Sequence, residues 1–264
     1  MGPIASLFLC LLCLSSAWAM AVSSSNISYL VDRSLQLLEK SSNAQQVYIG
    51  IAGGPGSGKS TLAQEVSHAI NQVQPISIVL SMDGYHIPRA ELEKMGKSGK
   101  VIGDPCDCTN GDFTTYEDLM LRRGAPWTFD PCSLIRDLTR AKTNGEGIFP
   151  VYSREISDPV PNGAIVTHEH KIIFCEGNYL LALDDPEWKP LESIWDDKWY
   201  IAVQENVVME RLVNRHLERW NAEKQKLWGD GRAGAMRKVE ASDLKNYRWI
   251  EATSRSHANL IIEN

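Results

Sequence analysis

The sequence predicts an α/β fold in which helices cover both faces of a mostly parallel sheet. Short apolar, β-branched runs alternate with stretches of helical character, and a glycine-rich turn follows the first such run. Strands that alternate with helices are typical of parallel sheets, because the helix carries the chain back to the starting edge. A length of 264 residues with 43% hydrophobic residues is sufficient for one domain with a full core.

The first elements can be assigned in chain order. Residues 27–40 place leucine, isoleucine and valine at helical spacing, which predicts an amphipathic helix. Residues 45–54 form an apolar run that ends at glycines, which predicts a buried strand entering a turn. Residues 61–70 are expected to form the next helix.

The later strands follow the same pattern. Four further apolar runs are predicted to be strands, at residues 76–82, 171–177, 198–203 and 258–263. Between the first two of them, residues 93–116 are rich in turn formers and predict an exposed insertion. A mobile flap over a substrate site is the alternative, because long loops beside active sites often act as lids.

The N-terminus has a separate character. Residues 4–22 are apolar and uncharged, and Ala17 and Ala19 flank Trp18 as a signal peptidase requires. We therefore expect residues 1–24 to be a signal-like or targeting segment and residues 25–264 to be the folded domain, without stable membrane association once the leader is removed. The leader indicates organelle or secretory entry; a cytoplasmic location, or an apolar helix packed on the domain, is the alternative if it is not functional.

Charge and cysteine content exclude some classes. A net charge of −6 argues against a general nucleic-acid binder, since phosphate backbones select for basic surfaces. Cys10 and Cys13 lie in the apolar N-terminus, and the other four cysteines include no C-x-x-C pair, so we expect reduced thiols and no zinc site. The sequence leaves open whether the chain forms a homodimer.

The turn after the first strand matches a phosphate-binding motif. It satisfies G-x-x-x-x-G-K-[ST], and the residues expected to hold the nucleotide are Gly53, Gly54, Pro55, Gly56, Ser57, Gly58, Lys59, Ser60 and Thr61. Glycines let backbone N–H groups surround phosphates, and the following helix presents its positive end to the anion. Lys59 is expected to reach the β- and γ-phosphates and Ser60 to bind Mg²⁺. ATP and Mg²⁺ are therefore the predicted cofactors.

Two acidic residues stand at predicted strand ends. Asp83 follows the strand at 76–82, where a carboxylate faces the ligand crevice of an open α/β sheet and can act as a base. Glu176 ends the strand at 171–177, a position from which Mg²⁺ or its water shell can be held. A turn aspartate and a solvated strand-end charge are the respective alternatives.

Two arginines lie one helical turn apart. Arg211 and Arg215 would share a helix face and could close over a transferring phosphoryl group. A solvated basic face is the competing interpretation.

These segments resemble the phosphoribulokinase/uridine kinase family of P-loop kinases, which includes bacterial-type pantothenate kinase. The resemblance runs from about Tyr29 to Asn264 and rests on GIAGGPGSGKSTLA, SMDGYH, RRGAPWTFD, PVYSREISDPVP, IIFCEGNYLL and ERLVNRH, in the order of the family. It implies a P-loop NTPase three-layer sandwich with a helical lid and ATP-dependent transfer to an alcohol. Asp83 would be the catalytic base, with Lys59, Arg211 and Arg215 assisting.

The resemblance also implies an acceptor pocket. The residues expected to bind the small hydroxylated substrate are Tyr85, His86, Arg123, Asp130, Tyr152 and Arg154. The segment Met82–His86 departs from the uridine kinase pattern, and Arg154-Glu155 differs from both better-known subgroups. A nucleoside such as uridine is therefore the expected acceptor, with pantothenate or a sugar as alternatives. A catalytically inactive ATP-binding regulatory protein is the alternative of another class.

Overall fold

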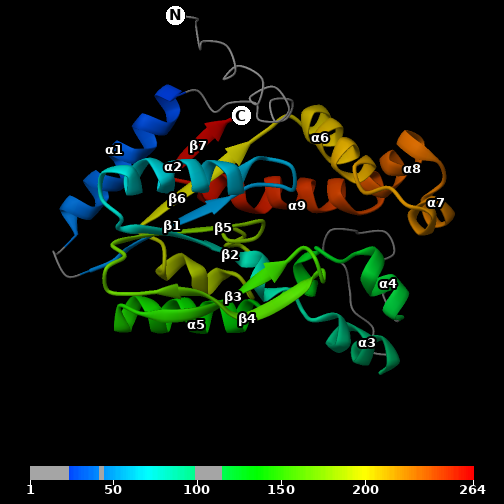
Figure 1. The fold of residues 1–264 in the computed structure, drawn as a ribbon, viewed down its shortest axis with the longest axis horizontal. Coiled ribbons are helices and arrows are strands. Elements are labelled where there is room, and N and C mark those ends of the chain that lie inside the picture. The colour runs from blue at the N-terminus through cyan, green and yellow to red at the C-terminus, as the bar shows by residue number, and fades with distance from the viewer. Residues whose placement is uncertain (1–23, 42–44, 99–114) are drawn as a thin grey trace, which may run out of the picture.

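The computed structural model describes residues 24–41, 45–98 and 115–264 and has a parallel five-stranded sheet at its centre (Figure 1). The strands are β1 (Val47–Ala52), β2 (Ser77–Ser81), β5 (Ile172–Gly177), β6 (Asp197–Ala202) and β7 (Leu260–Glu263). They lie in the order β2-β5-β1-β6-β7, and every neighbouring pair is parallel. The predicted fold class and all five predicted strands are confirmed.

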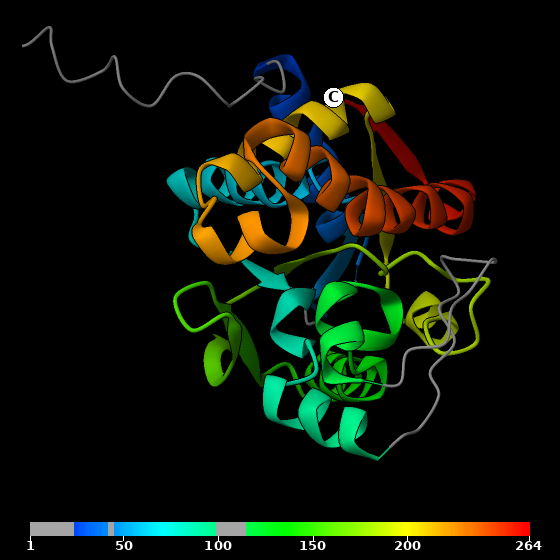
Figure 2. The same ribbon diagram turned by 90° about the vertical axis from the view of Figure 1, so that its right-hand side faces the viewer.

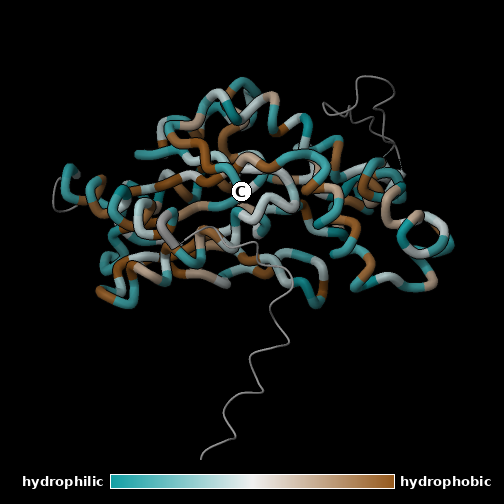
Figure 3. The backbone as a smooth tube through the Cα atoms, turned by 90° about the horizontal axis from the view of Figure 1, so that it is seen from above, coloured by the Kyte–Doolittle hydropathy of each residue, from teal (hydrophilic) through white to brown (hydrophobic). Residues whose placement is uncertain are grey.

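Two hydrophobic cores cover the two faces of the sheet. On β1, Ile49 and Ile51 pack toward one face, whereas Tyr48 and Ala52 pack toward the other. The first core is closed by α1 (Ser24–Lys40), α2 (Lys59–Val73) and α6 (Glu205–Leu217), and the second by α5 (Pro131–Asn144) and the segment around Trp188. Because successive strand residues point to opposite faces, one apolar run supplies both cores. In Figure 3, hydrophobic and hydrophilic residues alternate along the helices, as expected where one helix face packs on a core.

Two groups of smaller elements extend beyond the carboxyl edge of the sheet (Figure 2). One group holds α3 (Arg89–Lys97), α4 (Tyr116–Leu121) and an antiparallel hairpin of β3 (Gly147–Ser153) and β4 (Asp158–Val166). The other group continues α6 into α7 (Ala222–Trp228) and α8 (Gly231–Lys238), and returns through a π-helical turn at Val239–Asp243 to α9 (Leu244–Ser254). The second group matches the expected helical lid.

The segment between residues 93 and 116 differs in part from its prediction. The prediction of an insertion from Glu93 was wrong for its first residues, because α3 continues to Lys97. Glu93 and Lys97 form an i,i+4 ion pair of 2.6 Å, a spacing that supports helix. Residues 99–114, which are most of the predicted insertion and of its alternative as a flap, lie outside the described residues, as do residues 1–23 of the predicted leader. Across the described ranges, no helix combines the length and apolar character needed to cross a bilayer.

Candidate active site

The glycine-rich loop connects the end of β1 to the first residue of α2, as the motif predicts. Gly56 and Gly58 have φ angles of 78° and 91°, in the left-handed region that side chains with a Cβ avoid. At Gly54 a Cβ would come within 2.5 Å of the Tyr247 ring on α9. The loop therefore needs glycine for its backbone shape and for its packing against α9.

Three donors hold the carbonyl groups of this loop. The backbone N–H of Ser57 donates to the carbonyl of Gly54 at 3.1 Å. Arg211 Nη1 donates to the carbonyl of Gly56 at 3.2 Å, and Asn264 Nδ2 donates to that of Ser57 at 2.8 Å. The N-terminus of α2, which attracts anions, is thus held in place by contacts from α6 and from the residue after β7.

A carboxylate and two hydroxyl groups meet beside the start of α2. Ser60 Oγ donates to Glu176 Oε2 at 2.9 Å, and Ser81 Oγ donates to Glu176 Oε1 at 2.5 Å. Because the proton of Ser60 points to Glu176, the lone pairs of its oxygen are free for a cation. Hydroxyl and carboxylate oxygens are ligands that Mg²⁺ prefers. The structure brings together the two residues predicted to hold the metal, and their donor set fits it.

The charges of several predicted site residues act on Lys59. Burial lowers the pKa of Lys59, and the negative charges of Glu176 and Asp83 oppose that shift. Arg215 and Arg154 act in the same direction as burial, so both are close enough to affect the ammonium group. Charged residues from β5, from the turn after β2, from α6 and from the β3–β4 hairpin therefore all act electrostatically on one lysine.

Asp83 lies in the 3₁₀ turn Met82–Tyr85 directly after β2. Its backbone N–H donates to Ser81 Oγ at 3.3 Å, and its carbonyl lies 2.9 Å from His86 Nδ1. Within the described part of the chain, the side-chain carboxylate of Asp83 accepts no hydrogen bond, in contrast to that of Glu176. The main chain of Asp83 is fixed while its carboxylate is left available to accept a proton.

The six residues predicted to bind the acceptor fall into different environments. His86 stacks against Phe129 and Tyr152, with ring centroids 4.0 and 5.0 Å apart, and burial lowers its pKa. Tyr152 thus joins His86 in one aromatic group. Arg154 is exposed at the end of the hairpin, on the lysine side of the site.

The other three have partners within the fold. The hydroxyl of Tyr85 donates to Asp137 at 3.0 Å, and burial is the largest cause that raises its pKa. Asp130 accepts from the backbone N–H of Ser133 at 2.9 Å and so caps α5. Arg123 pairs with Asp158 on β4 at 2.7 Å. These contacts hold the acceptor side together.

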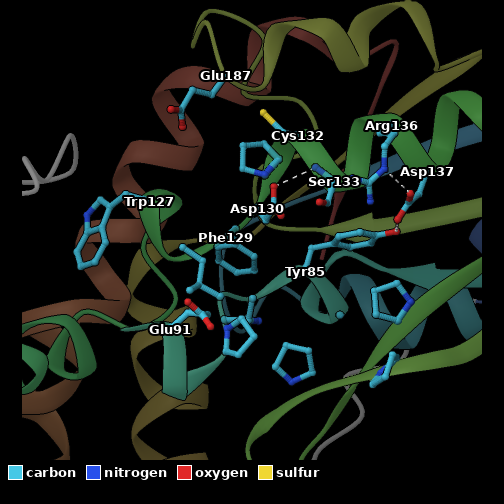
Figure 4. A pocket seen from close by; sticks show the side chains of 18 of the residues that line it. Tyr85, Glu91, Trp127, Phe129, Asp130, Cys132, Ser133, Arg136, Asp137 and Glu187 are labelled. Carbon is cyan, nitrogen blue, oxygen red and sulfur yellow. Dashed lines mark hydrogen bonds and ion pairs between the residues drawn. The ribbon is translucent and has the colours of Figure 1, made fainter. Parts of the chain in front are cut away.

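A cavity of about 680 Å³ is lined in part by the predicted acceptor residues (Figure 4). Its lining includes Tyr85, His86, Phe129, Asp130 and Trp127, but neither Lys59 nor Asp83. Of the predicted acceptor residues, Tyr85, His86 and Asp130 line this cavity, whereas the charge of Arg154 acts on Lys59.

Both predicted arginines lie on α6. Arg211 reaches the glycine-rich loop, whereas Arg215 is exposed and acts on Lys59 through its charge. The neighbouring His216 binds Asp243 in the π-helical turn at 2.8 Å. This contact ties the arginine-bearing end of α6 to the turn before α9.

The sequence interpretation missed three residues that organise the site. Ser81 holds the carboxylate of Glu176, and Asn264 holds the glycine-rich loop. The third residue is Arg122, which is buried and holds the segment that leads into α9. Only Ser81 carried a readable signal, since a serine two residues before Asp83 is a typical cap of a short helix.

Comparisons with known proteins identify the family. A Schizosaccharomyces pombe protein named "Putative uridine kinase C227.14" is 35% identical over 198 residues, which are 73% of this chain and 74% of that protein. The pantothenate kinase of Ligilactobacillus salivarius is 25% identical over 169 residues, 63% of this chain, and this chain spans 48% of that enzyme. No protein-family model matches the chain.

A solved structure gives the same result for the fold. It is that of a Silicibacter sp. TM1040 protein described as a "putative fructose transport system kinase", with a TM-score of 0.71 and 29% identity. The match covers 89% of this chain and 98% of that one. With the glycine-rich loop, the parallel sheet and the 35% identity to the yeast protein, the chain belongs to the phosphoribulokinase/uridine kinase family of P-loop kinases.

Proposed function

We propose that the protein transfers the γ-phosphate of ATP to a hydroxyl group of a nucleoside, with uridine as the first candidate. One observation carries the proposal: a hydrogen-bonded chain joins Ser60 of the glycine-rich loop to Glu176 and Ser81, and it ends at the main chain of Asp83. The charges of Glu176 and Asp83 also act on Lys59. A glycine-rich loop alone supports only nucleotide binding. The loop together with a free carboxylate and lid arginines supports phosphoryl transfer.

Each residue has a role that follows from its position. Asp83 orients the acceptor hydroxyl and takes its proton, because its carboxylate is otherwise uncommitted. Lys59 and Arg215 stabilise the negative charge on the phosphoryl group during transfer. Arg211 holds the glycine-rich loop and links its position to that of α6.

Ser60 and Glu176 are the residues that would hold Mg²⁺. When bound, Mg²⁺ neutralises phosphate charge and so reduces repulsion of the incoming oxygen. Glu176 keeps the Ser60 hydroxyl turned so that its oxygen lone pairs stay available.

Acceptor-dependent ATP turnover tests this proposal. The full chain would be assayed with Mg-ATP and uridine, cytidine, pantothenate, ribulose 5-phosphate, fructose or glycerate. We expect uridine to stimulate turnover most strongly. In the Lys59→Ala variant both turnover and ATP affinity should fall, since this side chain serves binding and transfer.

Other outcomes have distinct meanings. A stronger response to pantothenate or to a sugar would contradict the nucleoside acceptor and leave the phosphotransferase assignment in place. Tight Mg-ATP binding without stimulation by any of the six compounds would contradict the proposed function and favour an ATP-binding regulatory protein.

A further inference from the structure

We propose that Ser81 is a positioning residue for phosphoryl transfer. Its single hydroxyl group positions both the carboxylate of Glu176, which would hold the metal, and the candidate base Asp83. The inference rests on the proposed function and extends it to a residue outside the phosphate-binding motif. Its basis is a continuous chain of hydrogen bonds across the carboxyl edge of the sheet.

The chain of bonds runs through four residues. The backbone N–H of Asp83 donates to Ser81 Oγ, and Ser81 Oγ donates to Glu176 Oε1, at 3.3 and 2.5 Å. The other carboxylate oxygen, Glu176 Oε2, accepts from Ser60 Oγ at 2.9 Å. A hydroxyl group has one proton and two lone pairs, so Ser81 can make both of its bonds at once.

Strand register explains why Ser81 and Glu176 meet. They are register partners in the parallel pair of β2 and β5, so their side chains leave the sheet on the same face. Each is the last or next-to-last residue of its strand. A serine one position earlier or later would point to the opposite face.

The two bonds of Ser81 act on different parts of the site. Glu176 is only 5% exposed, and its carboxylate would be held at a single oxygen by Ser60 without Ser81. A hydrogen bond to an ionised carboxylate is stronger than one between neutral groups. On its other side, Ser81 is the N-cap of the 3₁₀ turn Met82–Tyr85 and fixes the main chain of Asp83.

Two measurements on Ser81→Ala test the proposal. The first compares ATP affinity with and without Mg²⁺ and does not require an acceptor. The second measures kcat and KM with uridine as the acceptor. We expect the strengthening of ATP binding by Mg²⁺ to shrink and kcat to fall by about tenfold, the effect of losing a hydrogen bond to a charged group. KM for uridine should change much less.

Matched variants separate positioning from stability. Ser81→Thr retains the hydroxyl and should restore both the Mg²⁺ effect on ATP affinity and kcat. Ser77→Ala is the control, because Ser77 lies on the same strand and its hydroxyl bonds Ser67 and Asn71 on α2. This control should lower the melting temperature without changing the Mg²⁺ effect or kcat. If Ser81→Ala does not fold, Ser81→Cys replaces the hydroxyl with a weaker donor of similar size.

An unchanged Mg²⁺ effect in a folded Ser81→Ala or Ser81→Cys variant would overturn the proposal, whatever its turnover. Absence of acceptor-dependent turnover in the wild type would instead contradict the proposed function. The Mg²⁺ effect on ATP binding would still decide the role of Ser81 in that case.

Discussion

At the scale of single residues, the buried environment of His86 makes the stability of the folded protein depend on pH. Its ring lies between Phe129 and Tyr152, and Asp83, Arg123 and Asp158 are the charged groups that act on it. Burial is the largest cause of its shift and lowers its pKa below the ordinary 6.5. The folded protein therefore holds a neutral imidazole where the unfolded chain would already take up a proton.

This difference gives a stability prediction with a definite sign. Below pH 6.5 the unfolded chain binds the His86 proton and the folded chain does not, so the free energy of unfolding falls as pH decreases. Between pH 7.5 and 5.5, His86→Gln should lose less stability than the wild type in urea titrations. His68→Gln, at an exposed position on α2, is the control. Equal losses in wild type and His86→Gln would show that His86 does not contribute to this pH dependence.

At the scale of elements, a buried arginine joins the two groups of helices at the edge of the sheet. Arg122, at the end of α4, donates to the carbonyl and hydroxyl of Ser242 and to Asn246 Oδ1, at 3.0 to 3.2 Å. Its side chain is almost fully buried. The group of elements that contains α4 is thereby fixed to α9 and to the π-helical turn Val239–Asp243.

Removal of this guanidinium should be costly. Arg122→Met keeps much of the side-chain volume but leaves buried oxygen atoms of Ser242 and Asn246 without a donor. We expect a loss of about 2 kcal/mol in the free energy of unfolding, measured by urea denaturation. Arg136→Met, on the exposed face of α5, should have little effect. Similar stabilities for the two variants would contradict the linking role of Arg122.

The β3–β4 hairpin shows why some elements escaped prediction. Pro150, Pro159 and Pro161 interrupt its apolar pattern, and prolines within a run argue against a central strand. The hairpin is a separate two-stranded sheet, so each of its strands is an edge and tolerates proline. Its register also shifts between Phe149 and Val151, which breaks the alternation on which prediction depends.

At the scale of the whole molecule, local patterns predicted the parallel sheet and the phosphate-binding loop. The loop lies within the strand–turn–helix context that its motif requires, and this context is contiguous in the chain. The meeting of Ser81 with Glu176 was not predictable in the same way, because it depends on β2 lying beside β5. Strand order is a property of the assembled sheet and not of any segment. Tyr85, His86 and Arg123 share this dependence, since their partners come from distant elements, whereas Asp130 caps its own helix.

In the proposed mechanism, Asp83 acts as the base in a phosphoryl transfer from a nucleotide bound at the glycine-rich loop. The most direct test measures acceptor-dependent turnover and ATP affinity in the same preparation of Asp83→Asn. We expect turnover to fall about 10²-fold, the lower range for loss of a general base, with ATP affinity nearly unchanged. Full turnover in Asp83→Asn would contradict the assignment of the base and the mechanism built on it.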